Sequence, residues 1–118
     1  MHAEQTEKRR RKRRHLLYYL KVFDRDSHDL IGEIIDITTD GFKLISDRPI
    51  ELHNTYHFQV ELPGELMHRT ELNLSVESMW HNKDINPDYY DTGFRMLHLP
   101  ETEAAAIESL IDKYGFEN

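Results

Sequence analysis

Short runs of apolar and polar residues, interrupted by turn-forming residues, fill most of the chain. Two runs alternate with the period of two that places apolar side chains on one face of a β-strand, and the others are dense in aromatic and β-branched residues. The six runs lie at residues 16–23, 30–36, 42–46, 55–62, 72–80 and 92–97. This pattern predicts six strands.

Turn signals separate these runs. The polar cluster 24–29 predicts a hairpin loop between the first two strands, and the segment Thr38–Gly41 predicts a second turn. Pro63 and Gly64 predict a turn between two strands that pair antiparallel.

The end of the chain changes to a helical pattern. Pro100 is favourable in the first turn of a helix, apolar residues then follow at helical spacing as far as Tyr114, and Gly115 is placed to end the helix. We expect a helix over about 101–114. Six strands followed by one amphipathic helix predict an all-β fold, either a small barrel or a sandwich, with the helix over one opening.

Charge divides the chain into two parts. A length of 118 residues suits one domain, and the net charge is −7. Residues 1–14 contain seven basic and two acidic side chains, a balance of +5, which leaves −12 for residues 15–118. We therefore expect a flexible basic arm, residues 1–14, before a folded acidic domain, residues 15–118.

Several function classes have no support in the sequence. The chain has no cysteine, its eight histidines follow no metal-ligand spacing, and it contains neither a nucleophile–base–acid set nor a glycine-rich phosphate loop. No apolar run approaches the roughly 18–20 residues that span a bilayer, and the N-terminus is charged. We predict a cytoplasmic binding module without enzymatic activity, cofactor, metal or membrane insertion.

Two motifs carry a resemblance. Residues 10–14 read Arg-Arg-Lys-Arg-Arg, an RxxxR pattern, and residues 36–41 read Asp-Ile-Thr-Thr-Asp-Gly. With the later segments 76–80 and 93–96, these motifs resemble a PilZ domain, the bacterial receptor module for cyclic di-GMP, over nearly the whole chain. The resemblance implies a six-stranded antiparallel PilZ-type β-barrel with a C-terminal α-helix, and cyclic di-GMP as the ligand.

The motifs depart from the family pattern in two respects. Thr38 stands where the [D/N]xSxxG motif has serine, which keeps the hydroxyl but adds a methyl group. The basic run also permits two registers, because Arg9 with Arg13 satisfies RxxxR as well as Arg10 with Arg14. We favour the later pair because it directly precedes the first strand. The resemblance thus implies a ligand site made of Arg9, Arg10, Arg13, Arg14, Asp36, Thr38 and Gly41.

Each of these residue types suits a guanine dinucleotide. Arginine clamps phosphate oxygens or guanine O6 and N7 with its planar fork and stacks on a purine. The Asp36 carboxylate accepts hydrogen bonds from guanine N1–H and the exocyclic amine, which makes it the expected selector for guanine. Thr38 bonds a base edge or its own turn, and Gly41 permits a positive φ and close approach of the chain. We expect Trp80 to lie in the core or at the rim of the barrel, and the alternative is that its ring stacks on a base of the ligand.

The expected function is that of a cyclic di-GMP receptor. Binding orders the basic arm across the barrel, and an unidentified downstream protein reads the ordered surface. The resemblance implies outputs in motility, adhesion, biofilm formation or virulence. Two alternatives remain open: a degenerate PilZ adaptor that binds only protein, and a general polyanion binder that holds RNA or DNA through its basic arm. The acidic body argues against a broad polyanion surface, and no specific nucleic acid is expected.

Overall fold

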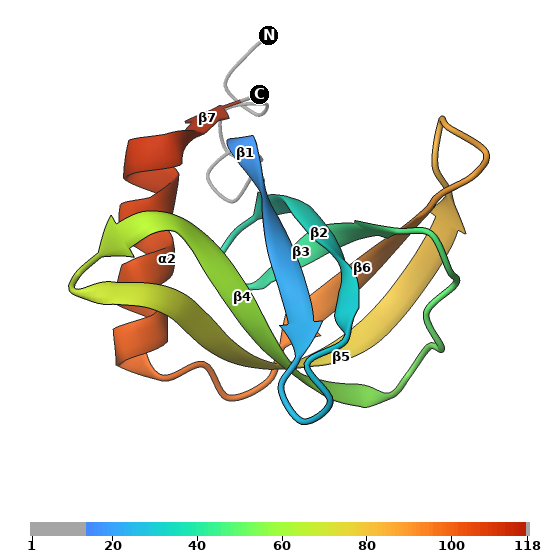
Figure 1. The fold of residues 1–118 in the computed structure, drawn as a ribbon, viewed down its shortest axis with the longest axis horizontal. Coiled ribbons are helices and arrows are strands. Elements are labelled where there is room, and N and C mark those ends of the chain that lie inside the picture. The colour runs from blue at the N-terminus through green and yellow to red at the C-terminus, as the bar shows by residue number, and fades with distance from the viewer. Residues whose placement is uncertain (1–13, 118) are drawn as a thin grey trace, which may run out of the picture.

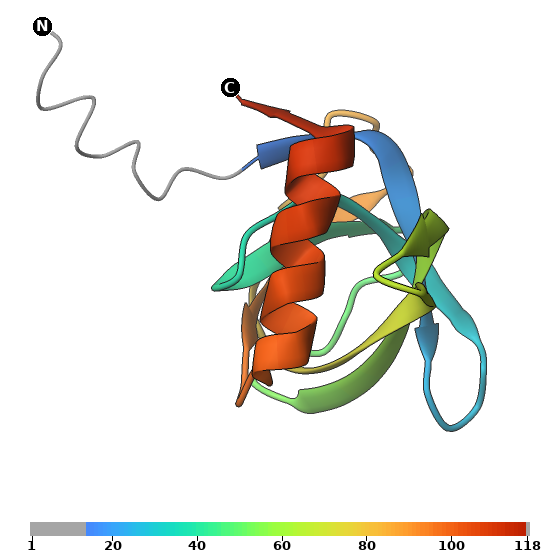
Figure 2. The ribbon, with the colours of Figure 1, turned by 90° about the vertical axis from the view of Figure 1, so that its left-hand side faces the viewer.

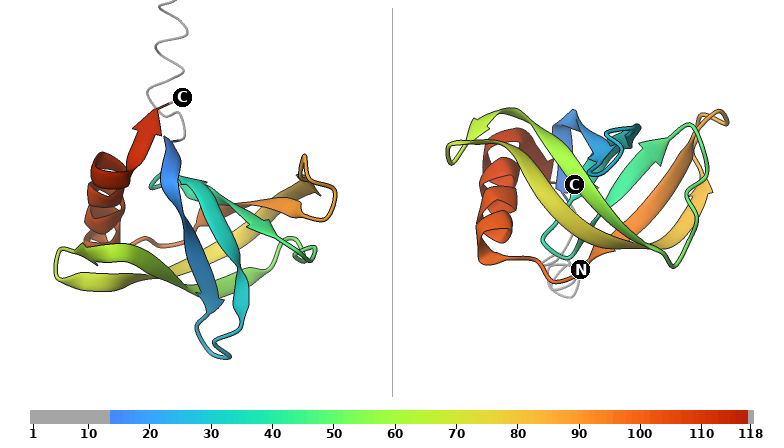
Figure 3. Two further views of the ribbon diagram at one scale, coloured as in Figure 1. Left: turned by 45° about the horizontal axis from the view of Figure 1, so that its top comes forward. Right: turned by 60° about the horizontal axis from the view of Figure 1, so that its bottom comes forward.

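Antiparallel pairing joins the six predicted strands into a closed barrel (Figure 1). The computed structural model describes residues 14–117. Its elements in chain order are β1 (Arg14–Asp24), β2 (Leu30–Ile37), β3 (Gly41–Ser46), β4 (Thr55–Leu66), β5 (Arg69–Lys83), β6 (Tyr90–Met96), α2 (Glu101–Tyr114) and β7 (Gly115–Glu117). The strand order is β2-β3-β6-β5-β4-β1-β7, and β2 also pairs with β1, which closes the sheet on itself (Figure 3). The predicted all-β barrel with a C-terminal helix is confirmed, and the sandwich alternative is wrong.

The turn between β4 and β5 was predicted at the wrong place. β4 continues through Pro63 and Gly64, and the chain reverses at Met67 and His68, where φ is 53° and 63°. Pro63 has no N–H to donate, and it is tolerated because pairing with β5 is irregular between Glu61 and Leu66. No local pattern predicts the true turn, because left-handed hairpin positions normally carry Asn or Gly rather than Met and His.

A short strand after the helix was not predicted. Gly115 ends α2 as expected, and its backbone N–H donates to the Ile111 carbonyl. Its φ of −104° is extended, however, so the chain leaves the helix directly as β7. β7 pairs with the beginning of β1, with Gly115 opposite Leu16.

Aromatic side chains from three strands fill the barrel. Phe42 of β3 stacks on Phe94 of β6 with ring centroids 5.0 Å apart, and Phe58 of β4 meets Phe94 edge to face at 5.4 Å. Such pairs add to the burial of apolar area and fix the relative position of their strands. The aliphatic core around them is Leu16, Leu20, Val22, Ile34, Ile37, Leu44, Val60, Leu62, Leu66, Leu72, Leu74 and Val76.

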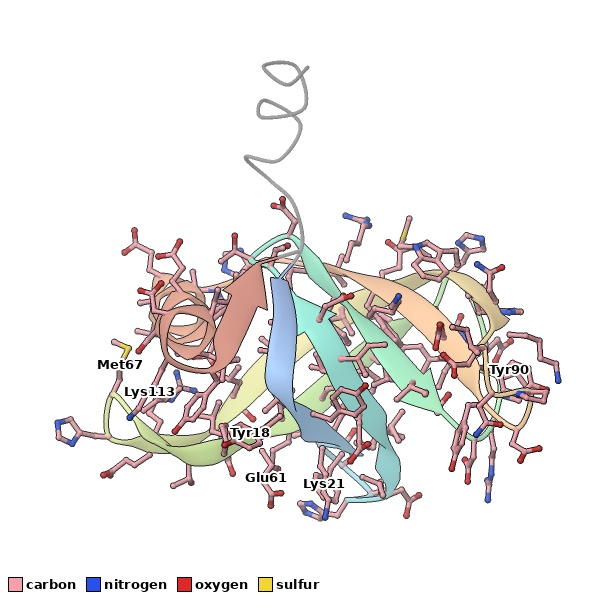
Figure 4. The ribbon with its side chains drawn as sticks, turned by 90° about the horizontal axis from the view of Figure 1, so that it is seen from above. Tyr18, Lys21, Glu61, Met67, Tyr90 and Lys113 are labelled. Atoms are coloured by element: carbon pink, nitrogen blue, oxygen red, sulfur yellow. The ribbon has the colours of Figure 1, made fainter. Side chains whose placement is uncertain are left out.

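The helix α2 lies across one end of the barrel (Figure 2). Its buried apolar residues, Ala106, Ile107 and Leu110, recur at helical spacing and join the barrel core. Met67 at the tip of the β4–β5 hairpin lies at this end of the molecule, whereas Tyr90 at the start of β6 lies at the other (Figure 4). No helix within residues 14–117 combines the length and the apolar composition needed to cross a membrane.

A partly buried ion pair fastens the start of α2 to the barrel. Both oxygens of Glu103 accept hydrogen bonds from the Arg69 guanidinium, one of them at 2.7 Å, and one oxygen also accepts the Asn73 N–H at 2.8 Å. Burial raises the pKa of Glu103, but these hydrogen bonds outweigh burial and hold the pKa below its ordinary value of 4.5. The stabilisation is therefore present above that pH and is lost as pH falls below it.

Removal of this carboxylate should destabilise the fold. Glu103→Ala leaves the Arg69 charge and the Asn73 N–H without their acceptor, and we expect the free energy of unfolding in urea to fall by about 2–4 kcal/mol near neutral pH. Glu108→Ala removes an exposed carboxylate from the same helix and should change it by less than about 0.5 kcal/mol. Equal effects of the two substitutions would contradict a structural role for the ion pair.

Candidate functional site

The closure of the barrel brings the beginning of β1 beside the end of β2. Arg14 is in register with Ile37, and His15 is in register with Asp36. The last residue of the RxxxR motif therefore lies across from the first residues of the Asp36–Gly41 motif in the β-sheet. Of the other predicted arginines, Arg9, Arg10 and Arg13 lie outside the described residues, and for Arg14 the structure defines the backbone.

Hydrogen bonds shape the turn between β2 and β3. The Thr38 hydroxyl oxygen accepts the Asp40 N–H at 3.0 Å, and the Thr38 N–H donates to the Gly41 carbonyl at 2.9 Å. The Asp40 carbonyl accepts the Met96 N–H of the neighbouring strand at 2.9 Å. Of the two roles considered for Thr38, the structure shows the bond to its own turn. That bond uses a lone pair, so the hydroxyl proton can still be donated to a ligand.

Gly41 is required for a different reason from the one expected. No glycine among the described residues has a positive φ, so the predicted left-handed conformation at Gly41 is wrong. A Cβ built on Gly41 would instead lie 2.1 Å from the Phe94 carbonyl oxygen. The residue thus allows close approach between β3 and β6, and any larger side chain would force the two strands apart.

Asp36 lies on the outward side of its strand, although it is buried. Its register partner on β3 is Lys43, whereas the neighbouring pair, Ile37 and Phe42, points into the core. A bulge between Ile34 and Asp36 changes the alternation here, and Asp36 is 1% exposed. Asp36 of β2, Lys43 of β3 and Gly93 of β6 are therefore neighbours across three adjacent strands. We refer to these three residues as the Asp36 row.

A cavity of about 320 Å³ opens beside the motif turn. It is lined by residues of the turn, of β3, of β5 and of β6, namely Thr38, Asp40, Gly41, Phe42, Met79, Trp80, Gly93, Phe94 and Arg95. Two of the predicted site residues, Thr38 and Gly41, thus share a cavity with side chains from the far half of the chain.

Trp80 forms one wall of this cavity and owes its position to a glycine. A Cβ on Gly93 would lie 2.2 Å from indole atoms of Trp80, so the ring packs directly on the bare backbone of β6. A bulge between Ser78 and Trp80 inserts Met79 as an extra residue in β5. Trp80 and Met79 are each 37% exposed, so both offer a face to a ligand.

Arg95 supplies a positive charge at the same place. Its Nε donates to Glu77 Oε1 at 2.8 Å and its Nη2 lies 2.6 Å from the same oxygen, while 55% of the side chain remains exposed. The ion pair holds the guanidinium plane in place and leaves other N–H groups of the fork for a ligand.

Comparison with known proteins decides the family. The model of the PilZ domain matches residues 7–113, which is most of the chain. The chain belongs to the PilZ domain family. No curated protein matches it.

Two solved structures resemble this PilZ domain in fold. One is the inhibitor of motility MotI/DgrA of Bacillus subtilis, with a TM-score of 0.65 and 10% identity over 86% of this chain and 48% of that one. The other is PlzA of Borreliella burgdorferi, solved in complex with c-di-GMP, with a TM-score of 0.58 and 18% identity over 93% of this chain and 54% of that one. This chain therefore spans about half the length of each neighbour.

The sequence predicts the side of this cavity that the β2–β3 turn forms, but not the side that β5 and β6 form. The Asp36–Gly41 motif was recognisable because its residues are adjacent in sequence. The sequence pattern does not predict Arg95 as a site residue, and it predicts Trp80 in the core or rim with base stacking as the alternative, because only strand pairing brings β5 and β6 to the motif. The pattern Gly-Phe-Arg at residues 93–95 was the available signal, since a glycine in a strand marks a close approach.

Two neighbouring carboxyl groups, those of Asp91 and Asp84, influence each other's pKa near the Asp36 row. Asp91 of β6 pairs with Ile45 of β3, and its Oδ1 is buried with no hydrogen-bond partner among the described residues. Burial, then the neighbouring Asp84, raise the pKa of Asp91 to about 6, against the opposing effect of Lys43. Hydrogen bonds, first from the Asn86 backbone, lower the pKa of Asp84. The pair thus keeps its proton on Asp91 in mildly acidic solution.

The Asp91 proton should make stability depend on pH. The pKa of Asp91 is about 6 in the folded state and near 3.8 when unfolded, so the fold loses stability as pH rises through this interval. Asp91→Asn cannot ionise, and we expect it to raise the free energy of unfolding by about 1–3 kcal/mol above pH 7.

Thermal unfolding over a range of pH measures this effect. The gain from Asp91→Asn should shrink as pH falls from about 6 to about 4. Asp88→Asn, in the loop that precedes β6, serves as the control, because Asp88 is exposed. A gain that does not depend on pH would rule out the ionisation of Asp91 as its cause.

Proposed function

We propose that this PilZ domain is a receptor for cyclic di-GMP, with the nucleotide held between the basic arm and the β2–β3 turn. The observation that carries the proposal is the register of Arg14 with Ile37 and of His15 with Asp36. This register joins the end of the arm to the motif turn. The proposed ligand residues are Arg9, Arg10, Arg13 and Arg14 of the arm with Asp36, Thr38 and Gly41 of the turn.

The chemistry of the two sides is complementary to the ligand. Residues 1–14 carry a balance of +5 from seven basic side chains, which suits two phosphates and the guanine N7 and O6 acceptors. The Asp36 carboxylate suits the guanine N1–H and amine donors, and the Thr38 hydroxyl proton suits an acceptor on the ligand. The solved complex of PlzA with c-di-GMP supports the same ligand class for this fold.

The cavity beside the turn extends this site. Its volume of about 320 Å³ lies at the low end of the range for ligand pockets, roughly 300–1,000 Å³, so it suits one base rather than the whole dinucleotide. The exposed face of Trp80 offers stacking to a purine, and Arg95 offers N–H donors at the rim. We propose that one guanine enters this cavity.

Calorimetric titration with cyclic di-GMP, against cyclic di-AMP, tests the proposal. We expect saturable binding selective for guanine. Arg14→Ala should weaken binding by tenfold or more, because one bidentate arginine contact contributes about 1–3 kcal/mol. Arg48→Ala removes an exposed arginine between β3 and β4 and should leave the affinity within twofold of wild type.

The outcomes separate the alternatives. Unchanged affinity in Arg14→Ala together with weaker binding in Arg13→Ala would assign the site to the register of Arg9 and Arg13. Equal affinity for unrelated oligonucleotides, falling steeply with salt, would indicate a general polyanion binder. The absence of heat and of any thermal shift with either nucleotide would contradict the receptor and favour an adaptor that binds only protein.

We further propose that the nucleotide acts by ordering the arm, which then presents a surface to a downstream protein. Bound phosphates would neutralise the basic side chains and hold them against the barrel. Amide hydrogen exchange should therefore slow in residues 8–15 when cyclic di-GMP is added, while residues 20–23 inside β1 stay unchanged. Exchange in residues 8–15 that is equally fast with and without nucleotide would contradict this mechanism.

A further inference from the structure

An open groove of about 390 Å³ lies outside the proposed nucleotide site. It is formed by β1, by the beginning of β2, by the end of β3 and by the loop that precedes β6, and its lining consists of Tyr19, Leu30, Ile31, Gly32, Glu33, Ile45, Ser46, Asp47 and Tyr89. The cavity beside Trp80 lies at the opposite ends of β2 and β3 and shares no lining residue with this groove. We refer to it as the Tyr19 groove.

Three large apolar side chains of the Tyr19 groove are exposed to solvent. Tyr19 is 56% exposed, Leu30 is 58% exposed and Tyr89 is 39% exposed, and each comes from a different segment of the fold. Within residues 14–117, neither tyrosine ring contacts another ring or a cation. Apolar side chains gathered on a surface in this way are typical of interaction sites, and tyrosine is enriched among the residues that dominate binding energy.

Backbone contacts define the walls of the Tyr19 groove. A Cβ on Gly32 would lie 2.3 Å from the Ile45 carbonyl oxygen, so the bare backbone lets β2 and β3 approach each other closely here. The Tyr89 carbonyl accepts the Asp84 N–H at 3.0 Å, and the Tyr89 N–H donates to the Asn86 carbonyl at 3.0 Å. These bonds fix the backbone that carries the Tyr89 ring, which lowers the ordering cost of binding a partner.

Two carboxylates make the Tyr19 groove acidic. Glu33 and Asp47 line it, and its lining contains no lysine, arginine or histidine. Lys21 of β1 is in register with Glu33, but in the described part of the chain neither Glu33 nor Asp47 makes an ion pair or a side-chain hydrogen bond. Residues 15–118 carry a balance of −12, so the surrounding surface adds to this negative charge.

A basic and partly apolar partner satisfies both features. An arginine or lysine side chain can lie over a tyrosine ring while its charge pairs with a carboxylate, and an aliphatic side chain fits beside Leu30 and Ile31. Charge complementarity of this kind selects the partner and speeds its association. We propose that the Tyr19 groove docks a segment of a partner protein that carries arginine or lysine among aliphatic side chains.

NMR titration of the ¹⁵N-labelled full chain with a synthetic amphipathic peptide of leucine and lysine tests the proposal. A peptide of the same pattern made of leucine and glutamate is the reference and should not bind, because its charge is repelled. We expect saturable shifts with the leucine–lysine peptide at residue 19, residues 30–33, residues 45–47 and residue 89.

Two neighbouring tyrosines give a matched pair of variants. Tyr19→Ser should weaken binding of the leucine–lysine peptide by about tenfold or more. Tyr18 is 58% exposed, but its ring packs on Tyr114 of α2 with centroids 5.8 Å apart and does not line the groove. Tyr18→Ser should therefore stay within about twofold of wild type, and equal losses in the two variants would overturn the proposal.

A second pair of variants tests the role of charge. Glu33→Gln combined with Asp47→Asn should weaken binding by about fivefold or more. Glu108→Gln combined with Asp112→Asn removes two exposed carboxylates of α2 and changes the net charge equally, and it should have little effect. Equal losses in the two double variants would indicate general attraction to an acidic domain and would overturn the proposal.

Two other occupants of the groove would also overturn it. Self-association of the chain through the same residues, measured by sedimentation, would make the groove an interface between copies. Groove signals that shift when residues 8–13 are replaced by serine, with no peptide added, would show that the basic arm of the chain itself fills it. Cyclic di-GMP binding should be the same in Tyr19→Ser as in wild type, and peptide binding the same in Arg14→Ala, so this proposal and the proposed receptor function fail independently.

Discussion

The pairing of β1 with β2 is the constraint on which the candidate site depends. It closes the barrel, and its register sets the backbone of Arg14 and His15 across from Ile37 and Asp36. Without this closure the RxxxR motif and the Asp36–Gly41 motif would be separate features of one chain. With it, Arg14, the last residue of the basic run, lies across from the start of the motif turn.

Two glycines allow close packing around that turn. Gly41 lets β3 approach the Phe94 carbonyl of β6, and Gly93 lets the Trp80 ring lie on the same strand. Gly41 and Gly93 directly precede Phe42 and Phe94 in their strands, and these two phenylalanines stack on each other inside the barrel. Phe42 and Phe94 also line the cavity, so the cavity is built on ring contacts of the core, which suits a site that must hold its shape before a ligand arrives.

Much of this architecture was predictable from local pattern. The six strands, the helix from Glu101 to Tyr114 and the motif turn follow from periodicity and turn chemistry, which depend on neighbouring residues. The hairpin turn at Met67 and His68 was not predictable, because it has left-handed residues of unusual type, and β7 is too short for a pattern. The far wall of the cavity, with Trp80 and Arg95, depends on bulges and strand order that no local pattern encodes.

Intermolecular NMR contacts show whether a guanine of bound cyclic di-GMP enters the cavity beside Trp80, because Trp80 is the single tryptophan and gives an isolated indole signal. We predict nuclear Overhauser effects from guanine H8 to the Trp80 ring and to the Thr38 methyl group. Contacts that map only to other faces of the barrel, or a complex whose Trp80 and Thr38 signals do not change, would contradict this placement of the nucleotide.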